Sequence, residues 1–315
     1  HCRYFKKMKI VFFGNPKFCL HPLLSLYNSQ YDIASVVTNT DRKSGRGLNL
    51  SSSFVKEKAL ELNIPIIETD NVHSDELFNQ LNDLNADLFV VVAFSVLPDN
   101  IISIPEYGSI NIHPSLLPKY RGSSPIQYAL LNGDEETGVS IINLNRKIDS
   151  GSILGQKKFS IPSSANFGYM YEKLGILGSE LLLEVIEDIK NNKSLTIVQD
   201  ESQKTLAPKI KKEQYKIDWN QNSIQIYNQI RAFDPYPGAY ALLNNKRIKL
   251  FGAQKEKIFN SPNLKVGQLL IEDDSLLIKS NTDFISISEV QLEGKKRVKS
   301  YDFIKTLENK EYILE

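Results

Sequence analysis

Two polar side chains stand near the end of an apolar run, in the stretch "INIHPSLLP" at residues 110–118. If the run begins as a β-strand, Asn111 and His113 point to one face and the flanking isoleucines to the other. Pro114 lacks a backbone N–H and should end the strand at that point. The sequence therefore predicts a carboxamide and an imidazole side by side at the carboxyl end of a strand.

Asp149 could complete a catalytic group with this pair. It lies in the turn "KIDSG" at 147–151, where an aspartate taken alone usually has only the role of stabilising the turn. If the turn folds over the pair, the carboxylate can orient the imidazole of His113, which can take or give a proton near neutral pH. The amide of Asn111 can donate to an oxyanion. A buried pair that only fixes the following loop is the alternative interpretation.

The chemistry that this group favours is direct acyl transfer between two bound substrates. No candidate nucleophile is paired with His113, and the four histidines and two cysteines show neither metal-site spacing nor a disulfide framework. We therefore expect no metal. The turn at 14–17, "GNPK", is not a phosphate-binding loop, which argues against the common nucleotide-binding uses of an α/β sheet.

The first half of the chain alternates short apolar runs with helical patterns. This alternation predicts an α/β fold with a Rossmann-like, mostly parallel sheet covered by helices on both faces. In such sheets, ligands bind beyond the carboxyl ends of the strands, where Asn111 and His113 are expected. The predicted strands are 9–14, 33–38, 64–67, 88–94, 110–113 and, partly antiparallel, 138–144 and 152–159, and a long amphipathic helix starts near Tyr169.

A chain of 315 residues exceeds what one core usually organises, so two domains are expected. The predicted bounds are 8–197 for a catalytic domain, 198–215 for a polar linker and 216–315 for a second domain. The second domain combines one helix near 222–232 with short strands separated by the turns "NN" (244–245), "DD" (273–274) and "EG" (293–294). This spacing is typical of a small β-barrel.

The composition is that of a soluble globular protein, with 41% hydrophobic and 24% charged residues and a net charge of +1. This charge excludes a uniformly basic nucleic-acid binder but allows local basic patches. The apolar run at 88–94 is too short to cross a bilayer. Together with the two cysteines, these features favour a reducing, cytosol-like compartment. Residues 1–7 precede Met8 and lack the apolar core of a signal peptide, so they are left out of the fold expectation.

Three basic segments could contact a phosphate backbone if they lay around one cleft. Each by itself is as compatible with a solvated surface. The candidate residues are Arg42, Lys43 and Arg46 in the first segment, Lys209 in the linker, and Lys295, Lys296 and Arg297 near the C-terminus.

The run "INIHPSLLPKYRGSSPIQYALLNGDEETGVSI" followed by "KIDSG" resembles the folate-dependent formyltransferase family. The resemblance implies that Asn111, His113 and Asp149 are the catalytic residues. It also implies that Ser115, Leu116, Leu117 and Pro118 bind 10-formyltetrahydrofolate, and that Phe94, Val96 and Leu97 help to form the pterin pocket.

Four further segments resemble the members of this family that formylate methionyl-initiator tRNA. These are "TNTDRKSGRG", "QDESQKTLAPKIKKEQYKIDW", "IRAFDPYPGAY" and "QLEGKKRV". They imply a C-terminal OB-like tRNA-binding domain and assign the basic candidates above to the tRNA. Thr40, where the family commonly has proline, could change how the loop presents Arg42. We expect a cytoplasmic monomer, bacterial in preference to organellar.

Other activities remain compatible with these residues. A formyltransferase acting on a small amine, such as an amino-sugar nucleotide, would not need the basic segments. A folate- or RNA-binding protein without catalysis would not need the group Asn111, His113 and Asp149. Hydrolysis of the formyl-folate would differ only in using water as the acceptor.

Overall fold

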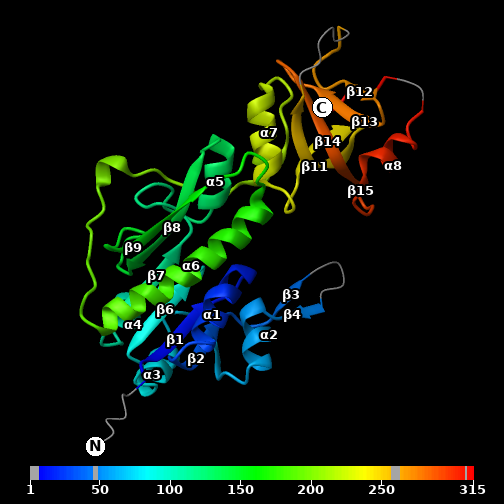
Figure 1. Ribbon diagram of the computed structural model, residues 1–315. Coiled ribbons are helices and arrows are strands. Elements are labelled where there is room, and N and C mark those ends of the chain that lie inside the picture. The colour runs from blue at the N-terminus through cyan, green and yellow to red at the C-terminus, as the bar shows by residue number, and fades with distance from the viewer. Residues whose placement is uncertain (1–6, 45–48, 257–262, 309–310) are drawn as a thin grey trace, which may run out of the picture. The chain divides into compact units, whose positions relative to one another are not determined.

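The computed structural model describes residues 7–44, 49–256, 263–308 and 311–315 (Figure 1). The chain forms two compact units. Unit 1 comprises residues 1–125, 136–160 and 171–208, and unit 2 comprises residues 126–135, 161–170 and 209–315. The change between the units at 208/209 falls inside the predicted linker, while 126–135 and 161–170 lie within the predicted catalytic domain. The domain bounds given above stay a prediction.

Unit 1 is built on a seven-stranded sheet with the order β5-β2-β1-β6-β7-β8-β9. The five strands from β5 to β7 are parallel, and β8 and β9 are antiparallel additions, as predicted. The strands are β1 (Lys9–Gly14), β2 (Asp32–Thr38), β5 (Ile66–Glu68), β6 (Leu88–Val92), β7 (Ser109–His113), β8 (Glu136–Asn143) and β9 (Ile153–Ser160). A separate ribbon pairs β3 (Arg42–Ser44) with β4 (Asn49–Ser51).

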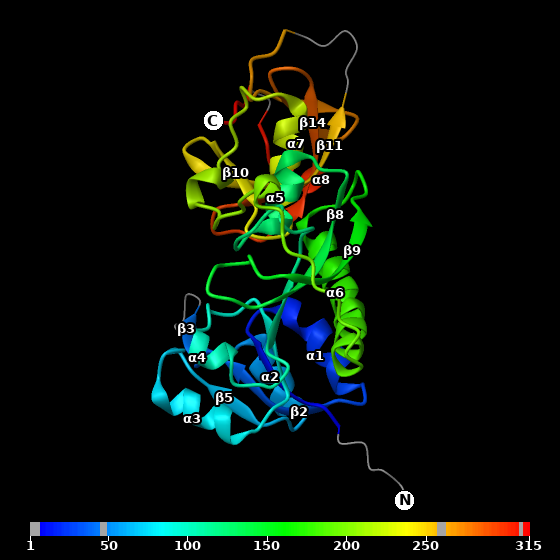
Figure 2. The same ribbon diagram turned by 90° about the vertical axis from the view of Figure 1, so that its left-hand side faces the viewer.

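Helices cover both faces of this sheet, and Figure 2 shows α1 and α6 on one side and α3 and α4 on the other. The helices are α1 (Leu20–Tyr27), α2 (Phe54–Glu61), α3 (Asp75–Asp83), α4 (Asp99–Ile102) and α6 (Phe167–Lys190). A Cβ added at Gly178 of α6 would lie 3.1 Å from Ile112, so α6 covers the isoleucine face of β7. The opposite face packs Leu77 and Leu81 of α3 against Val91 of β6. The alternation of β7 directs Asn111 and His113 to this opposite face.

Unit 2 is a five-stranded antiparallel sheet with the order β10-β11-β14-β13-β12, to which β15 is added beside β14. Its elements are α5 (Pro125–Asn132), α7 (Ser223–Ala232), β10 (Ala239–Leu243), β11 (Lys246–Glu256), β12 (Leu269–Glu272), β13 (Ser275–Lys279), β14 (Phe284–Leu292), β15 (Val298–Lys299) and α8 (Ser300–Ile304). Short 3-10 turns occupy Glu201–Gln203 in unit 1 and Lys212–Tyr215 in unit 2.

The C-terminal residues join the two edges of the sheet in unit 2. Glu315 exchanges backbone hydrogen bonds of 2.8 and 3.0 Å with Leu242 of β10, and the carbonyl of Tyr312 accepts one of 2.9 Å from Leu269 of β12. Both edge strands are therefore covered by one segment, as in a closed barrel. This arrangement agrees with the predicted OB-like barrel.

Candidate active site

His113 and Asp149 meet at the carboxyl end of β7. The distance from Nδ1 of His113 to Oδ2 of Asp149 is 3.6 Å, and the two side chains are 5% and 13% exposed. β8 pairs antiparallel with β7 and ends with Asn143 opposite Ile110, so the turn after β8 starts at the level where β7 begins and runs back along β7 to bring Asp149 to His113. Asp149 lies in this turn, so the structure brings the two residues together as the sequence pattern suggested.

The loop after β7 bonds to both members of this pair. The backbone N–H of Gly122 donates to Oδ2 of Asp149 at 2.8 Å. Nε2 of His113 lies 2.9 Å from the carbonyl oxygen of Tyr120, which can only accept, so the ring donates there. The imidazole is thus fixed between a carboxylate on one edge and a carbonyl on the other.

Asn111 has a different environment. Its side chain is half-buried, and none of the residues that the structure describes hydrogen-bonds to it. In the sheet Asn111 is aligned with Val91, so both belong to the face where Phe94 and Leu97 complete the apolar cluster. A half-buried amide without a protein partner beside a buried imidazole is suited to donate to a ligand oxygen.

The predicted folate residues lie on the loops after β6 and β7, two neighbouring strands. Phe94 and Leu97 pack into the cluster on the Asn111 face, whereas the Val96 side chain is 57% exposed. Ser115 is fully buried, and its hydroxyl donates to the carbonyl of Lys119 at 2.6 Å. Leu117 is buried, while Leu116 and Pro118 are half-buried. Val96, Leu116 and Pro118 therefore have surface available for a ligand.

A row of polar residues across three strands, missed from the sequence, fixes the loop after β7. His113, Ser140 and Gln156 are aligned in register on β7, β8 and β9. Ser140 Oγ donates to the carbonyl of Ser115 at 2.6 Å and accepts from the backbone N–H of Leu117 at 3.0 Å. Gln156 donates to the Leu117 carbonyl at 2.9 Å and to Ser140 Oγ at 2.8 Å. A serine within the apolar run "VSII" was the signal in the sequence.

Two of the basic candidates of unit 1, Arg42 and Lys43, belong to strand β3 of the β3–β4 ribbon. Arg42 is exposed and pairs with Asp70 at 3.1 Å. Asp70 also accepts hydrogen bonds from Thr40 and Asn39, and these bonds, with Arg42, lower the pKa of its carboxyl to about 2. Thr40 and Arg42 thus bond to the same carboxylate, and the effect of Thr40 on how the loop presents Arg42 stays a prediction. Lys43 is part of β3, and Arg46 lies outside the described residues.

The basic candidates of unit 2 differ in how far their charge is already matched. Lys209, Lys295 and Lys296 are exposed. Arg297, in contrast, pairs with Glu289, lies 3.5 Å from Asp234 and stacks at 3.8 Å over the ring of Phe251. The Arg297 side chain is still 33% exposed, but its charge is already matched by carboxylates of unit 2. That all the basic segments surround one cleft stays a prediction.

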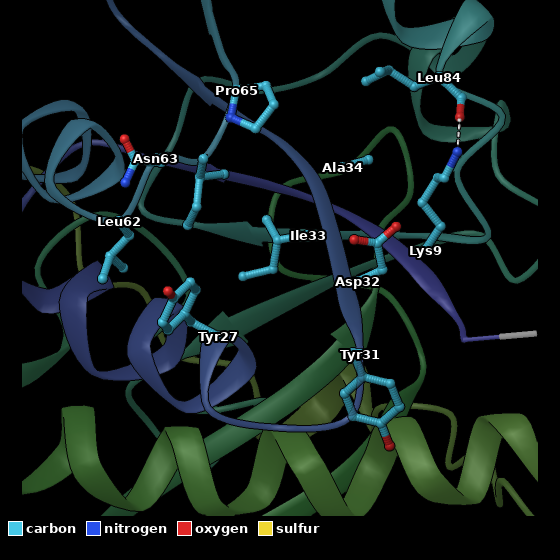
Figure 3. Close-up of a pocket in the computed structure, with 11 residues that line it drawn as sticks. Lys9, Tyr27, Tyr31, Asp32, Ile33, Ala34, Leu62, Asn63, Pro65 and Leu84 are labelled. Carbon is cyan, nitrogen blue, oxygen red and sulfur yellow. Dashed lines mark hydrogen bonds between the residues drawn. The ribbon is translucent and has the colours of Figure 1, made fainter.

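A pocket at the opposite edge of the sheet is separate from this site (Figure 3). It is lined by Lys9 and Asp32, which begin β1 and β2, and by Tyr27, Ile33 and Pro65, among others. Parallel strands place these residues at their amino ends, away from His113. Among the described residues no three His, Cys, Asp or Glu side chains are grouped as a metal site requires, and no described helix is long and apolar enough to cross a membrane.

Family comparisons cover both units. The sequence model described as "Formyl transferase" matches residues 8–186, and "Formyl transferase, C-terminal domain" matches residues 209–308. The methionyl-tRNA formyltransferase of Listeria welshimeri is 39% identical over 300 residues, which are 94% of this chain and 95% of that protein. The enzyme of the same name from Caldanaerobacter subterraneus is 36% identical over 293 residues, or 92% and 94% of the two chains.

Solved structures agree on the fold. The methionyl-tRNA formyltransferase of Clostridium thermocellum has a TM-score of 0.57 at 17% identity, with 90% of this chain and 98% of that chain covered. WlaRD, a sugar 3N-formyl transferase, has a TM-score of 0.65 at 24% identity, with 92% and 99% covered.

HypX from Aquifex aeolicus, in complex with tetrahydrofolic acid, has a TM-score of 0.65 at 18% identity. The match covers 95% of this chain but about half, 47%, of the HypX chain. The solved structures, with identities from 17% to 24%, show only that the fold is shared. The two sequence relatives, at 36% and 39% identity, show membership of the same family. The chain belongs to the formyl transferase family and, within it, groups with the methionyl-tRNA formyltransferases.

Proposed function

We propose that this protein transfers the formyl group of 10-formyltetrahydrofolate to the amino group of methionyl-initiator tRNA, for translation initiation. The observation that carries the proposal is the His113–Asp149 pair next to Asn111, whose amide bonds to none of the residues that the structure describes. This group occurs in a chain that matches methionyl-tRNA formyltransferases along 94% or more of their length.

Asn111 would act on the formyl oxygen. When the amine of the acceptor attacks the formyl carbon, negative charge develops on this oxygen, and a preorganised amide donor stabilises that charge. His113 would be the second donor. Its Nε2 is bonded to the Tyr120 carbonyl in the structure, so donation to substrate requires that this hydrogen bond is exchanged.

Asp149 would orient the imidazole and help to remove the proton of the attacking amine. Its carboxylate is held by the Gly122 N–H and lies within ion-pair distance of His113. A carboxylate in this place stabilises the positively charged imidazole that forms during proton transfer. The amine nitrogen loses a proton as the new C–N bond forms, and the folate nitrogen gains one as its C–N bond to the formyl group breaks, which releases tetrahydrofolate.

The residues present fit a folate. 10-Formyltetrahydrofolate supplies the activated formyl carbon. The loops 94–98 and 115–118 would hold it, because they follow neighbouring strands and offer the apolar surfaces of Val96, Leu116 and Pro118. The partnerless amide of Asn111 lies on the same face as Phe94.

The tRNA would be contacted by basic residues of both units. We assign phosphate contacts to Arg42, Lys43 and Arg46 in unit 1 and to Lys209, Lys295 and Lys296 in unit 2. Arg297, whose charge is already paired with Asp234 and Glu289, would contribute less directly. We further propose a monomer in a bacterial cytoplasm, since the sequence relatives named above are bacterial.

The test uses the full chain, 10-formyltetrahydrofolate and four acceptors: initiator methionyl-tRNA, free methionine, a nucleotide-linked amino sugar and water. Formylation of the charged tRNA but not of free methionine is the expected result. Formylation of the amino sugar in place of the tRNA would replace the proposed substrate. Release of formate at the same rate with and without any amine would replace transfer by hydrolysis.

A further inference from the structure

Gln199 joins the loop after β7 to the turn that carries Asp149, although it comes from the segment expected to be a linker. Its Nε2 donates to the backbone carbonyls of Asp149 at 2.8 Å and Gly151 at 2.7 Å. Its Oε1 accepts from Nε and from an Nη of Arg121, at 3.0 and 2.7 Å. Both hydrogens and the oxygen of one buried amide are therefore used to bridge two loops of the site.

Arg121 lies between the two residues that bond to the catalytic pair. Tyr120 accepts from His113, and Gly122 donates to Asp149. The Arg121 side chain is only 6% exposed, and its charge is matched by Glu201 at 2.7 Å. The planar guanidinium donates two N–H groups to Gln199 and also donates to Glu201. A lysine ammonium could not reproduce this geometry.

The backbone of the same segment adds a second attachment. Arg121 donates to the carbonyl of Thr205 at 3.0 Å and accepts from the N–H of Ala207 at 2.7 Å. The hydroxyl of Thr205 accepts from the N–H of Tyr120 at 2.8 Å. Residues 199–207, part of the predicted polar linker, therefore bind the loop after β7 through side-chain and backbone hydrogen bonds.

The Asp149 backbone needs such support. Its φ of +51° lies in the left-handed region, which residues other than glycine adopt only occasionally. A carbonyl held by Gln199 limits rotation of the peptide that follows Asp149 and so limits where its carboxylate can point. Small displacements of a catalytic group can reduce the rate strongly, by about 10²-fold for 1 Å.

We propose that Gln199 and Arg121 are positioning residues for formyl transfer: Gln199 holds Asp149 against His113 by donating to the backbone of the Asp149 turn, and Arg121 holds Gln199. The inference rests on the proposed function. It assigns to residues 199–207 a role in the catalytic unit itself.

The decisive variant is Gln199→Glu. It keeps the shape of the side chain and an acceptor for Arg121, but it replaces the donor to the carbonyls of Asp149 and Gly151 by a carboxylate oxygen that repels them. We expect kcat to fall about 10- to 100-fold, with the KM values for both substrates within about threefold of wild type. Gln203→Glu is the matched control, because Gln203 bonds only within its own exposed turn, to Asp200.

A role through Asp149 is tested by repeating Gln199→Glu in an Asp149→Asn background. Residues that act as one unit show non-additive effects, so the loss caused by Gln199→Glu should shrink to less than about threefold there. An equal loss in both backgrounds would overturn the proposal, as would a kcat of Gln199→Glu within twofold of wild type. If Gln199→Glu does not fold, Gln199→Met, which removes the donor without adding charge, takes its place in the same comparison.

The proposed substrate and the proposed positioning role of Gln199 are tested by different measurements. Wild type and Gln203→Glu report whether methionyl-tRNA is the substrate, whichever way Gln199→Glu behaves. If both use another acceptor, the kcat comparison is made with that acceptor, and the positioning role is judged by the same ratios. Arg121→Lys provides an independent check, with an expected fall in kcat similar to that of Gln199→Glu.

Discussion

Asp149 faces His113 from a backbone in the left-handed conformation, with a φ of +51° and 3.6 Å between Oδ2 and Nδ1. Aspartate and asparagine adopt this conformation more readily than other non-glycine residues. The position therefore has two separate requirements. The backbone accepts Asp or Asn, whereas the pairing with the imidazole needs the negative charge of Asp.

Asp149→Asn separates these requirements. The Asn side chain can still accept from Gly122 N–H and fits the backbone, so the melting temperature should stay within a few degrees of wild type. Loss of the charge should lower kcat about 10²- to 10⁴-fold. The measurement is kcat by formylated product, together with thermal unfolding. A kcat within fivefold of wild type would remove Asp149 from the mechanism.

Asp149→Ala is the companion variant. It loses the hydrogen bond from Gly122 as well as the preference for a positive φ, which together should cost about 2 kcal/mol of unfolding free energy. We expect the same low kcat as for Asp149→Asn but a clearly lower melting temperature. Equal stability of the two variants would show that the turn conformation is not maintained by residue 149.

Asn111→Ala tests the oxyanion donor. The Asn111 amide makes no hydrogen bond to the described residues, so its removal should leave the melting temperature nearly unchanged. Turnover should fall about 10²- to 10³-fold, the usual cost of losing one such donor. The result to look for is a fall in kcat at constant stability, and unaltered turnover would contradict the assigned role.

Regular patterns in the sequence were sufficient to predict the sheet and the turns. Alternation of apolar runs with helical spacing gave the parallel strands, and the pairs Asn244–Asn245 and Asp273–Asp274 lie in the left-handed turns of two hairpins. The helix α5 was missed because its eight residues, starting at Pro125, show no clear period between two loops. The spacing of short strands predicted a small barrel but not that the C-terminal residues bond to both β10 and β12. A single bonding segment has no repeating sequence pattern from which it could be predicted.

The site was predicted only in part, because local patterns place some of its residues and long-range contacts place the others. Asn111 and His113 could be placed on one face by alternation alone, whereas the approach of Asp149 depended on how a turn folds. Gln199 and Arg121 escaped prediction because long-range side-chain contacts over 78 residues leave no local pattern. Their sequence neighbourhoods are polar, and polar segments are read as exposed unless the partner is known.

Asp70 should make the β3–β4 ribbon sensitive to acid. Hydrogen bonds from Thr40 and Asn39, and the pairing with Arg42, lower its pKa from 3.8 to about 2. A carboxyl with a lowered folded-state pKa stabilises the fold above its unfolded pKa, and this contribution is lost as the pH falls from about 4 towards 2. The melting temperatures of wild type and Asp70→Asn should therefore differ at pH 6 and converge as the pH falls to about 2. A difference that does not depend on pH would refute this assignment.

Arg297→Gln should act mainly on stability. The variant leaves Asp234, whose side chain is 6% exposed, without its cation and removes the stacking on Phe251. We expect a loss of about 2–3 kcal/mol in unfolding free energy. Urea unfolding of the full chain measures it. A stability loss below about 0.5 kcal/mol, combined with weaker tRNA binding, would instead identify Arg297 as a direct phosphate ligand.

Replacing both Lys295 and Lys296 by Gln should weaken tRNA binding without affecting the fold. Both side chains are exposed and lie in the turn between β14 and β15. Removing one lysine–phosphate interaction should reduce the slope of log K against log [salt] by about 1, so the double variant should reduce it by up to about 2. Lys299→Gln is the matched control, because Lys299 is already paired with Glu289 at 2.6 Å and should change the slope less. The role of the two lysines would be refuted by a binding curve with unchanged midpoint and slope, while a change equal to that of Lys299→Gln would indicate only a general effect of charge.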